Sequence, residues 1–302
     1  SEAEAALQPV AATNLFLELD GAAVCLLRSA EGGHAFAEVL LEPPGPDLIA
    51  RKRPGPPRFE DLVISFAPSS DTKPLNSWIG DMLTKGPVSR NGAVVYADMN
   101  FNVAKRLEFV NASLSEITLP KIDAADSNIV AMTLRLTPQS THLSGGGGKA
   151  PSMLSSKTKS LRMNQFRFNV QGLEAACGRI AKIEALSARR GAPSAAAGQD
   201  KFRQALPAGN VLDCSLVSIT LPEPDAGPFY SWFDDMVLKG NAAAERVGLL
   251  EWLDPTGKPS LSVQLGGLGI VRYAPAPAKP DGGMKAPMAQ VDLYCQTMNV
   301  IM

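Results

Sequence analysis

The side chains best able to do chemistry are few in this chain and lie far apart. Histidine occurs only at His34 and His142, and neither stands at ligand spacing from a cluster of Cys, Asp or Glu, so no zinc site is expected. A Ser-His-Asp triad would need one of these histidines, and no serine has the nucleophile-elbow context. Carboxylate chemistry is the one kind that these absences leave open. We therefore expect no enzyme, no metal and no cofactor.

The cysteines and the glycine-rich segments offer little more. We interpret the four cysteines as buried thiols, because they are widely spaced and form no CxxC pair, although spacing leaves a disulfide open; they are Cys25, Cys177, Cys214 and Cys295. Gly145–Gly148 precede Lys149, but Ala150 and Pro151 follow where a phosphate-binding loop needs Ser or Thr and a helix, which favours a flexible linker. The glycines at 266, 267 and 269 indicate a bulge or a close backbone contact within a strand.

The elements that position these residues are repeated in the sequence. Residues 75–86 read LNSWIGDMLTKG and residues 229–240 read FYSWFDDMVLKG, so six residue types recur at the same relative positions. The similarity extends outward through several strand-like segments, each in two versions: 14–21 and 164–172, 62–66 and 216–221, 92–96 and 248–252, and 129–136 and 289–297. Asp98 and Asp254 open equivalent turns. The chain therefore consists of two copies of one unit.

Each copy is predicted to contain one short helix, which surrounds its repeated tryptophan. Pro74 and Pro228 precede the apolar faces and Gly86 and Gly240 follow them. The apolar positions have helical spacing: Leu75, Trp78, Ile79, Met82 and Leu83 in copy 1, and Phe229, Trp232, Phe233, Met236 and Val237 in copy 2. We interpret Trp78, Met82, Trp232 and Met236 as core anchors rather than ligand-stacking residues.

Charged residues on these helices and in two long loops are the candidate contacts between subunits. Asp81 with Lys85, and Asp235 with Lys239, are spaced for i,i+4 ion pairs on the solvated face, or for bonds to a neighbouring subunit. The Pro-rich residues 43–57 are predicted to form a long irregular loop, and 189–209 is its counterpart in copy 2. Their candidate contact residues are Arg51, Lys52, Arg53, Arg58, Arg189 and Arg190. Residues 274–287 form a Pro-rich insertion special to copy 2.

Length and composition agree with two domains and exclude several classes of function. The 302 residues, 45% of them hydrophobic, suit a domain at 1–143, a Gly/Ser/Lys linker at 144–160 and a second domain at 161–302. The net charge of −1 gives no reason to expect binding to nucleic acid or to a membrane surface. No apolar segment is long enough to span a bilayer, and residues 1–4 lack the features of a signal peptide, so assembly in the cytoplasm is expected.

One repeat unit resembles the tail tube protein family of contractile phages and contractile injection systems. The motifs that carry the resemblance cover most of copy 1: FLELDG at 16–21, LVISF at 62–66, LNSWI at 75–79, RNGAVV at 90–95 and LEFVNA at 107–112. Copy 2 keeps the tryptophan helix but has Arg-Val-Gly at 246–248 and Gly-Leu at 267–268 in place of the family residues. These departures weaken any inference about the contacts of copy 2.

The resemblance implies a mainly β fold: two tandem tail-tube-like β-barrel or sandwich domains, each with one short α-helix. It further implies that six such domains close a ring, so three two-domain chains would form one with pseudo-sixfold symmetry. The expected function is structural, as a tube subunit or as a specialised initiator, terminator or adaptor ring. The expected partners are further copies of the chain and the sheath, baseplate or other tail proteins. The alternative is a two-barrel binding module that captures a cargo or a partner protein.

Overall fold

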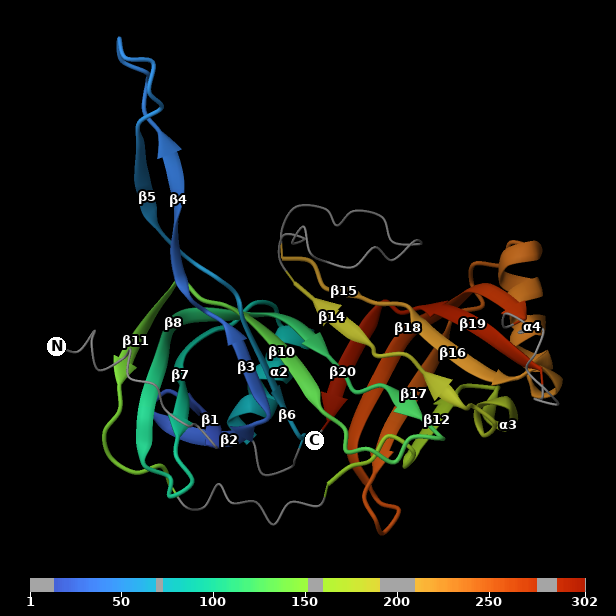
Figure 1. Cartoon of the computed structure of the whole chain (residues 1–302). Helices are drawn as coiled ribbons and strands as arrows, with labels where there is room; N and C mark the ends of the chain where they lie inside the picture. The colour runs from blue at the N-terminus through green and yellow to red at the C-terminus, as the bar shows by residue number, and fades with distance from the viewer. Residues whose placement is uncertain (1–13, 69–72, 152–159, 191–209, 276–286, 302) are drawn as a thin grey trace, which may run out of the picture. The chain divides into compact units, whose positions relative to one another are not determined.

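A computed structural model describes residues 14–68, 73–151, 160–190, 210–275 and 287–301 (Figure 1). The described chain is mainly β, which confirms the predicted class. It divides into two compact units: unit 1 comprises Ser1–Ser65, Ser89–Ser113 and Arg135–Ser155, and unit 2 comprises Phe66–Val88, Leu114–Leu134 and Ser156–Met302. The Trp78 helix of copy 1 therefore belongs to the same unit as copy 2. The predicted domains, 1–143 and 161–302, were placed at the limits of the two repeat copies, and they remain a prediction.

Unit 1 contains most of the first sheet. The strand order is β2-β1-β7-β8-β10-β6-β3, and β11 also pairs with β8. The bounds are β1 Asn14–Leu19, β2 Ala22–Leu27, β3 Ser29–Gly32, β6 Leu62–Phe66, β7 Ser89–Ala97, β8 Val103–Thr118, β10 Met132–Thr137 and β11 Ser140–Gly145. Strand residues alternate between faces, so Leu17, Val94 and Leu107, which are paired in register, are buried together.

A separate two-stranded ribbon includes residues 52–57 of the irregular loop predicted at 43–57, whereas residues 43–51 lie outside its strands. Strand β4 (Ala35–Leu41) pairs with β5 (Lys52–Phe59), and β5 carries Lys52, Arg53 and Arg58. The expectation of an irregular loop was wrong for these residues. A strand of a two-stranded ribbon has one unpaired side, so β5 can include prolines, which lack the N–H that a central strand needs.

Unit 2 contains a second sheet, with strand order β12-β17-β18-β19-β16-β13-β9 and with β20 paired to β18. The bounds are β9 Ile122–Asp123, β12 Phe166–Val170, β13 Lys182–Ile183, β16 Val217–Pro222, β17 Arg246–Leu253, β18 Pro259–Pro275, β19 Met288–Tyr294 and β20 Thr297–Ile301. Strand β14 (Ser187–Arg189) pairs with β15 (Asp213–Cys214) and with the last residues of β8. Arg189 thus lies on a strand rather than in the predicted loop, most of which is outside the described residues.

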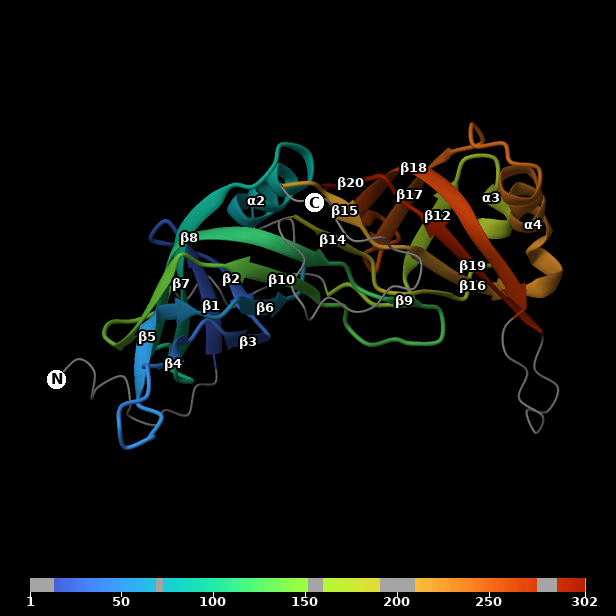
Figure 2. The same cartoon turned by 90° about the horizontal axis from the view of Figure 1, so that it is seen from above.

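The helices of unit 2 comprise both tryptophan segments. Helix α2 (Lys73–Thr84) contains Trp78, whereas α4 (Gly227–Phe233) contains Trp232 and continues as a π-helical segment, η3 (Asp234–Leu238). A 3-10 turn, η2 (Glu223–Asp225), precedes α4, and a short helix, α3 (Glu174–Cys177), contacts it (Figure 2). Cys25 and Cys177, which follow Gly21 and Gly172 at nearly the same distance in the two copies, differ in setting, because Cys25 lies on β2 and Cys177 on α3.

The long hairpins of the two copies have the same irregularity at the same place. The register of β7 and β8 shifts between Arg90 and Gly92, and that of β17 and β18 shifts between Arg246 and Gly248. Opposite each shift stands a residue with positive φ, Asn111 at 46° and Gly267 at 59°. Asparagine and glycine tolerate this conformation best. The departure of copy 2 from the family motif therefore preserves the bend, and the bulge predicted at the glycines is confirmed.

The two predicted turns also match in detail. The Asp98 carboxylate accepts hydrogen bonds from the backbone N–H groups of Asn100 and Asn102, both at 2.9 Å. In the same way, Asp254 accepts from Thr256 at 2.8 Å and from Lys258 at 3.0 Å. A side chain that bonds to the backbone two residues ahead fixes such a turn. Both hairpins are therefore closed by the same device.

Several sequence predictions need correction at the ends of elements. The segment Gly145–Gly148 is no free linker, because Val103 donates a backbone hydrogen bond to Gly148 and a Cβ on Gly146 would meet the Val103 carbonyl. The last strand of copy 1 begins at Met132 rather than at 129, and that of copy 2 is divided into β19 and β20. Residues 152–159 of the predicted linker and 276–286 of the predicted insertion lie outside the described residues.

Candidate assembly surfaces

The two tryptophans are buried and hold their helices by the same hydrogen bond. The indole N–H of Trp78 donates to the carbonyl of Val88, and that of Trp232 donates to the carbonyl of Ala244, both at 2.7 Å. Trp78 and Met82 have no exposed surface, and Trp232 is 2% exposed. A buried indole needs an acceptor for its N–H. In each copy this bond ties the helix to the segment that leads into the next strand.

The C-terminal halves of the two helices differ. Leu83 is 4% exposed, whereas its counterpart Val237 is 44% exposed and the next residue, Leu238, is 61% exposed. Met236 is only half-buried, in contrast to Met82. The predicted apolar face was therefore wrong beyond Phe233. The cause is the π-helical turn, which bonds residues five positions apart instead of four and rotates the later side chains away from the α-helical stripe.

The same turn changes the ion pairs. In α2 the predicted i,i+4 pair is present, with the Lys85 ammonium 3.2 Å from the Asp81 carboxylate. In copy 2 Lys239 instead lies 3.0 Å from Asp234, five residues earlier. Asp235 accepts a hydrogen bond from the side-chain amide of Asn241 at 3.1 Å. The expected pair of Asp235 with Lys239 was therefore wrong, because the wider turn brings residue i+5, here Lys239, beside residue i, here Asp234.

The C-terminal end of α2 packs beside an edge strand of the other copy. Helix α2 contacts β20, and Leu83 and Thr84 line a groove together with residues of that strand. Arg190 donates hydrogen bonds to the carbonyls of Met82 and Leu83, which have no partner within the helix at its end. Arg190 also donates to the Asn210 carbonyl at 2.8 Å. Within unit 2 a helix of copy 1 is thus fixed by residues of copy 2.

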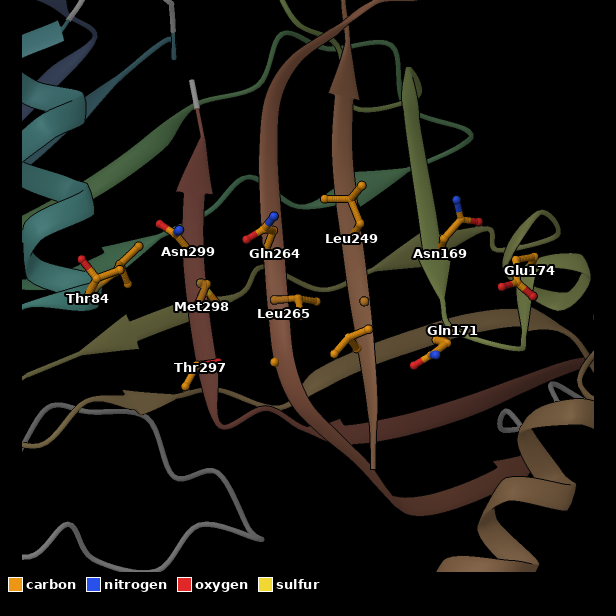
Figure 3. Close-up of a pocket in the computed structure, with 14 residues that line it drawn as sticks. Thr84, Asn169, Gln171, Glu174, Leu249, Gln264, Leu265, Thr297, Met298 and Asn299 are labelled. Atoms are coloured by element: carbon orange, nitrogen blue, oxygen red, sulfur yellow. The ribbon is translucent and has the colours of Figure 1, made fainter. Parts of the chain in front are cut away.

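The groove beside α2 has a volume of about 860 Å³ and extends over the outer face of the sheet of unit 2 (Figure 3). Four strands each contribute one residue to a row in register across its floor. The row comprises Asn169, Leu249, Gln264 and Asn299. Figure 3 shows Thr84 of α2 on one side of these side chains and Glu174 of α3 on the other. The floor is uncharged, with amides and aliphatic groups.

An equivalent groove of about 410 Å³ occurs in unit 1. The row matched by register comprises Glu18, Ala93 and Glu108, which line this groove, and His142 beyond them. Arg106 makes a hydrogen-bonded ion pair with Glu18, and its Nε lies 3.7 Å from Glu108. The hydrogen bond to Glu18, together with the nearby carboxylates, raises the pKa of Arg106. The two grooves therefore share a backbone but differ in charge. The sequence analysis of each copy by itself did not identify these rows. They become visible when the alternating residues of equivalent strands in the two copies are aligned.

The candidate contact residues of the ribbon are paired with nearby acids. Arg51 lies 2.5 Å from Asp47 and Arg53 lies 3.5 Å from Glu42. Arg58 pairs with Glu38 and also lies over the ring of Phe36, at 5.9 Å from its centroid. Lys52 is exposed, and Arg189 lies 3.1 Å from Asp213 on the neighbouring strand. The ribbon is nearly neutral, so its role as a subunit contact remains a prediction.

The thiols are buried, and none of the four cysteines forms a disulfide. Burial raises the pKa of Cys25 to about 12 and that of Cys177 to about 11. A hydrogen bond with Cys214, together with burial, raises the pKa of Cys295. Thiolates are the reactive form, and the raised pKa values keep Cys25, Cys177 and Cys295 in the thiol form near neutral pH. Among the described residues, no group of three or more His, Cys, Asp or Glu is placed to hold a metal ion.

The helices of the described chain are also too short or too polar for a membrane. None of them could cross a bilayer.

Comparisons with known proteins find similarity in structure. No family model and no curated protein matches the chain. Three similar solved structures are the sheath/tube terminator of the extracellular contractile injection system PVC, at 12% identity and TM-score 0.40; the tube-terminating cap of the anti-feeding prophage, at 15% and 0.41; and Hcp1 from Flavobacterium johnsoniae, at 17% and 0.33. They cover 46%, 46% and 45% of this chain, and 98%, 92% and 99% of their own. Tube and tube-terminator proteins, the class that the sequence resembles, are thus among the solved structures to which it is similar.

Proposed function

We propose that the chain is a structural subunit of a phage tail or a phage-tail-like contractile injection system, in which it forms a ring or tube. The observation that carries the proposal is the contact of α2 with β20 in unit 2. It joins a helix of copy 1 to an edge strand of copy 2. Because the two copies are equivalent, it is a contact between unlike surfaces of two like building blocks.

A contact of this kind leaves a complementary pair of surfaces unused. Copy 2 still has its own helix, and copy 1 still has its own edge strand, β11. Head-to-tail contacts between unlike surfaces generate a closed ring when the rotation closes and a filament when it does not. Pairing of the remaining strand edges also protects them from uncontrolled association. The resemblance of the sequence to tail tube proteins favours closure, with three chains in a pseudo-sixfold ring.

The two copies are different enough to suggest a specialised ring. One groove is lined by carboxylates and the other by amides, so the wall of a threefold ring would alternate between two kinds of surface. A bulk tube has no need of such alternation. We therefore favour an initiator, terminator or adaptor ring, which meets sheath, baseplate or other tail proteins on at least one side.

The test is the mass and symmetry of the purified protein. A ring of three 31.9 kDa chains has a mass of about 96 kDa, which mass photometry resolves from a monomer. Negative-stain images should show rings whose class averages have threefold and approximate sixfold symmetry. A species of 31.9 kDa alone, at concentrations well above those used for imaging, would contradict the proposal.

The groove in unit 2 favours a second candidate, a binding module. Its volume of about 860 Å³ and its mixture of Leu249 and Met298 with side-chain amides suit a bound segment of a partner protein. The substitution Leu249→Arg fills the groove without touching the core. If partner capture is the function, this variant loses a partner while rings, if any, persist. If assembly alone is the function, the variant behaves as the wild type.

A further inference from the structure

We propose that the end of the copy-2 helix, Val237 and Leu238, docks beside strand β11 of a second copy of this chain. This inference rests on the proposed function and specifies the residues that would close the ring. It follows from a contact already present in unit 2, where α2 contacts β20. The partner is the same protein, because both surfaces are repeated versions of the surfaces in that contact.

The contact within the chain supplies the template. Leu83 is almost fully buried at the end of α2, and Thr84 and Leu83 line the groove with Met298 and Asn299 of β20. Figure 3 shows Thr84 on the side of the groove that β20 forms. The helix end thus stands beside an edge strand that pairs with β18 on its other side.

The helix half of the equivalence follows from the two tryptophans. Trp78 aligns with Trp232, which aligns Leu83 with Val237 and Thr84 with Leu238. The copy-2 pair is the more apolar of the two, yet it is 44% and 61% exposed. A single exposed aliphatic residue is ordinary. Two adjacent ones, at the positions that meet an edge strand in the other copy, indicate a surface that is covered on assembly.

The strand half of the equivalence follows from the sheet register. Asn299 pairs with Gln264, which pairs with Leu249, and at the same places His142 pairs with Glu108, which pairs with Ala93. Strand β11 is therefore the copy-1 version of β20. It pairs with β8 on one side, and Leu143 adds an aliphatic side chain that is 36% exposed. An apolar helix end has an apolar group to meet there.

A second pair of surfaces supports the same direction of assembly. Strand β14 of copy 2 pairs with β8 of copy 1 at Glu116–Thr118, and this buries Ala188 completely. Its copy-1 counterpart is the start of β4: Ala35 pairs with Phe59 as Ala188 pairs with Cys214. Ala35 is exposed.

The site that Ala35 would occupy is also present. The position on β18 equivalent to Glu116–Thr118 is 272–274, which among the described strands pairs only with β19. Docking of the copy-2 helix on β11 and addition of β4 to β18 therefore use both sets of unmatched surfaces between the same two chains. Each contact has its model within unit 2.

The first experiment disrupts the helix contact in the full chain. Leu238→Glu places a charge in the proposed apolar contact, and Met99→Glu is the matched control, because Met99 is 73% exposed in the Asp98 turn. Leu238→Glu is expected to raise the protein concentration needed for rings at least tenfold and to leave the circular dichroism spectrum and thermal midpoint of the monomer unchanged. Met99→Glu is expected to assemble like the wild type. Normal ring formation by Leu238→Glu would overturn the inference.

The second experiment maps the contact by crosslinking. The double variant His142→Cys with Leu238→Cys, treated with a short bis-maleimide, should give crosslinks between chains and dimer and trimer bands on a denaturing gel. The matched pair Asn299→Cys with Thr84→Cys should crosslink within one chain and stay monomeric. The wild-type protein, treated in the same way, shows whether the native cysteines react; all four are buried.

The outcomes separate the inference from the proposed function. Rings in the wild type without a crosslink between 142 and 238 would overturn the inference and leave the ring function intact. Crosslinked chains that never form a closed ring would support the contact and contradict the ring. If the protein forms no rings and no crosslinks between 142 and 238, while the 84–299 pair does crosslink, both the inference and the ring function are contradicted. The exposed helix end would then be a contact for a different protein.

Discussion

The two grooves show how the copies differ while their backbones match. Each lies along a row of four residues in the same register, Glu18 to His142 in one and Asn169 to Asn299 in the other. On the opposite face of the same strands the paired residues stay apolar, as in Leu107 and Val263. Because residues in a strand alternate between faces, the buried face has kept the fold while the exposed face has exchanged carboxylates for amides. A duplicated fold can thus present two chemically distinct surfaces.

The helices make a second contrast. In α2 the apolar stripe stays α-helical to Leu83 and is covered by the rest of unit 2. In copy 2 the π-helical turn exposes Val237 and Leu238. The π turn also moves the lysine from one aspartate to another. The difference lies in the last turn of the helix, since the tryptophans make the same hydrogen bond. The equivalence of the copies is therefore best tested with paired substitutions, one in each copy.

The largest effects are expected from the tryptophans. Trp78→Ala and Trp232→Ala each remove a fully packed indole and its hydrogen bond, and each should lower the free energy of unfolding by about 3–5 kcal/mol. Trp78→Ala should lie at the upper end, because Ile79 and Met82 beside it are completely buried. Chemical denaturation followed by circular dichroism measures both. A cost below about 1 kcal/mol for either would mean that the two helices are not equivalent anchors.

How much the sequence predicted depends on the range of the interaction. The tryptophan helices, the strands beside them and the Asp98 and Asp254 turns follow from local spacing and turn chemistry, and the structure has them. The ribbon strand β5 did not follow, because prolines usually mark loops and its tolerance for them comes from having an unpaired side. The position of α2 beside β20 depends on residues more than a hundred positions away, such as Arg190, and local periodicity carries no record of them.

The next largest effect tests the two bulges. A Cβ on Gly92 would lie 2.2 Å from the Glu18 carbonyl and 2.6 Å from the Phe109 ring, whereas one on Gly248 would meet only the Leu268 side chain below 3 Å. Gly92→Ala should therefore cost about 3 kcal/mol and Gly248→Ala about 1 kcal/mol, because backbone cannot yield as a side chain can. Denaturation midpoints compare them. Gly80→Ala is the control: a Cβ there meets nothing within 4 Å, and alanine should stabilise the helix. Equal costs for the two bulge variants would contradict the contrast.

A smaller effect concerns the charges of the copy-1 row. Arg106 and Glu18 are 29% and 15% exposed at the side chain, so we expect a coupling of about 1 kcal/mol in a double-mutant cycle with Arg106→Gln and Glu18→Gln. The coupling should fall as salt is added. The equivalent positions in copy 2 are Asn169 and Ser262. Installing Asn169→Glu together with Ser262→Arg should create a coupling of similar size if the two faces share one geometry, and no coupling would show that they do not.

The smallest effect concerns the pH dependence of the Asp98 turn, the copy-1 member of the two matched turns. Hydrogen bonds from Asn102, through its side chain and its backbone, hold the pKa of Asp98 below its usual range. A carboxylate whose folded pKa is lowered stabilises the fold fully above its unfolded pKa, and this contribution is lost as the pH falls through the folded value. In NMR spectra the Asp98 carboxyl carbon should therefore titrate with a midpoint below that of an unperturbed aspartate. Asn102→Ala should move this midpoint upward, because the hydrogen bond from the Asn102 side chain is removed. An Asp98 midpoint that does not change in Asn102→Ala would mean that the backbone of the turn, and not the Asn102 side chain, lowers the pKa of Asp98.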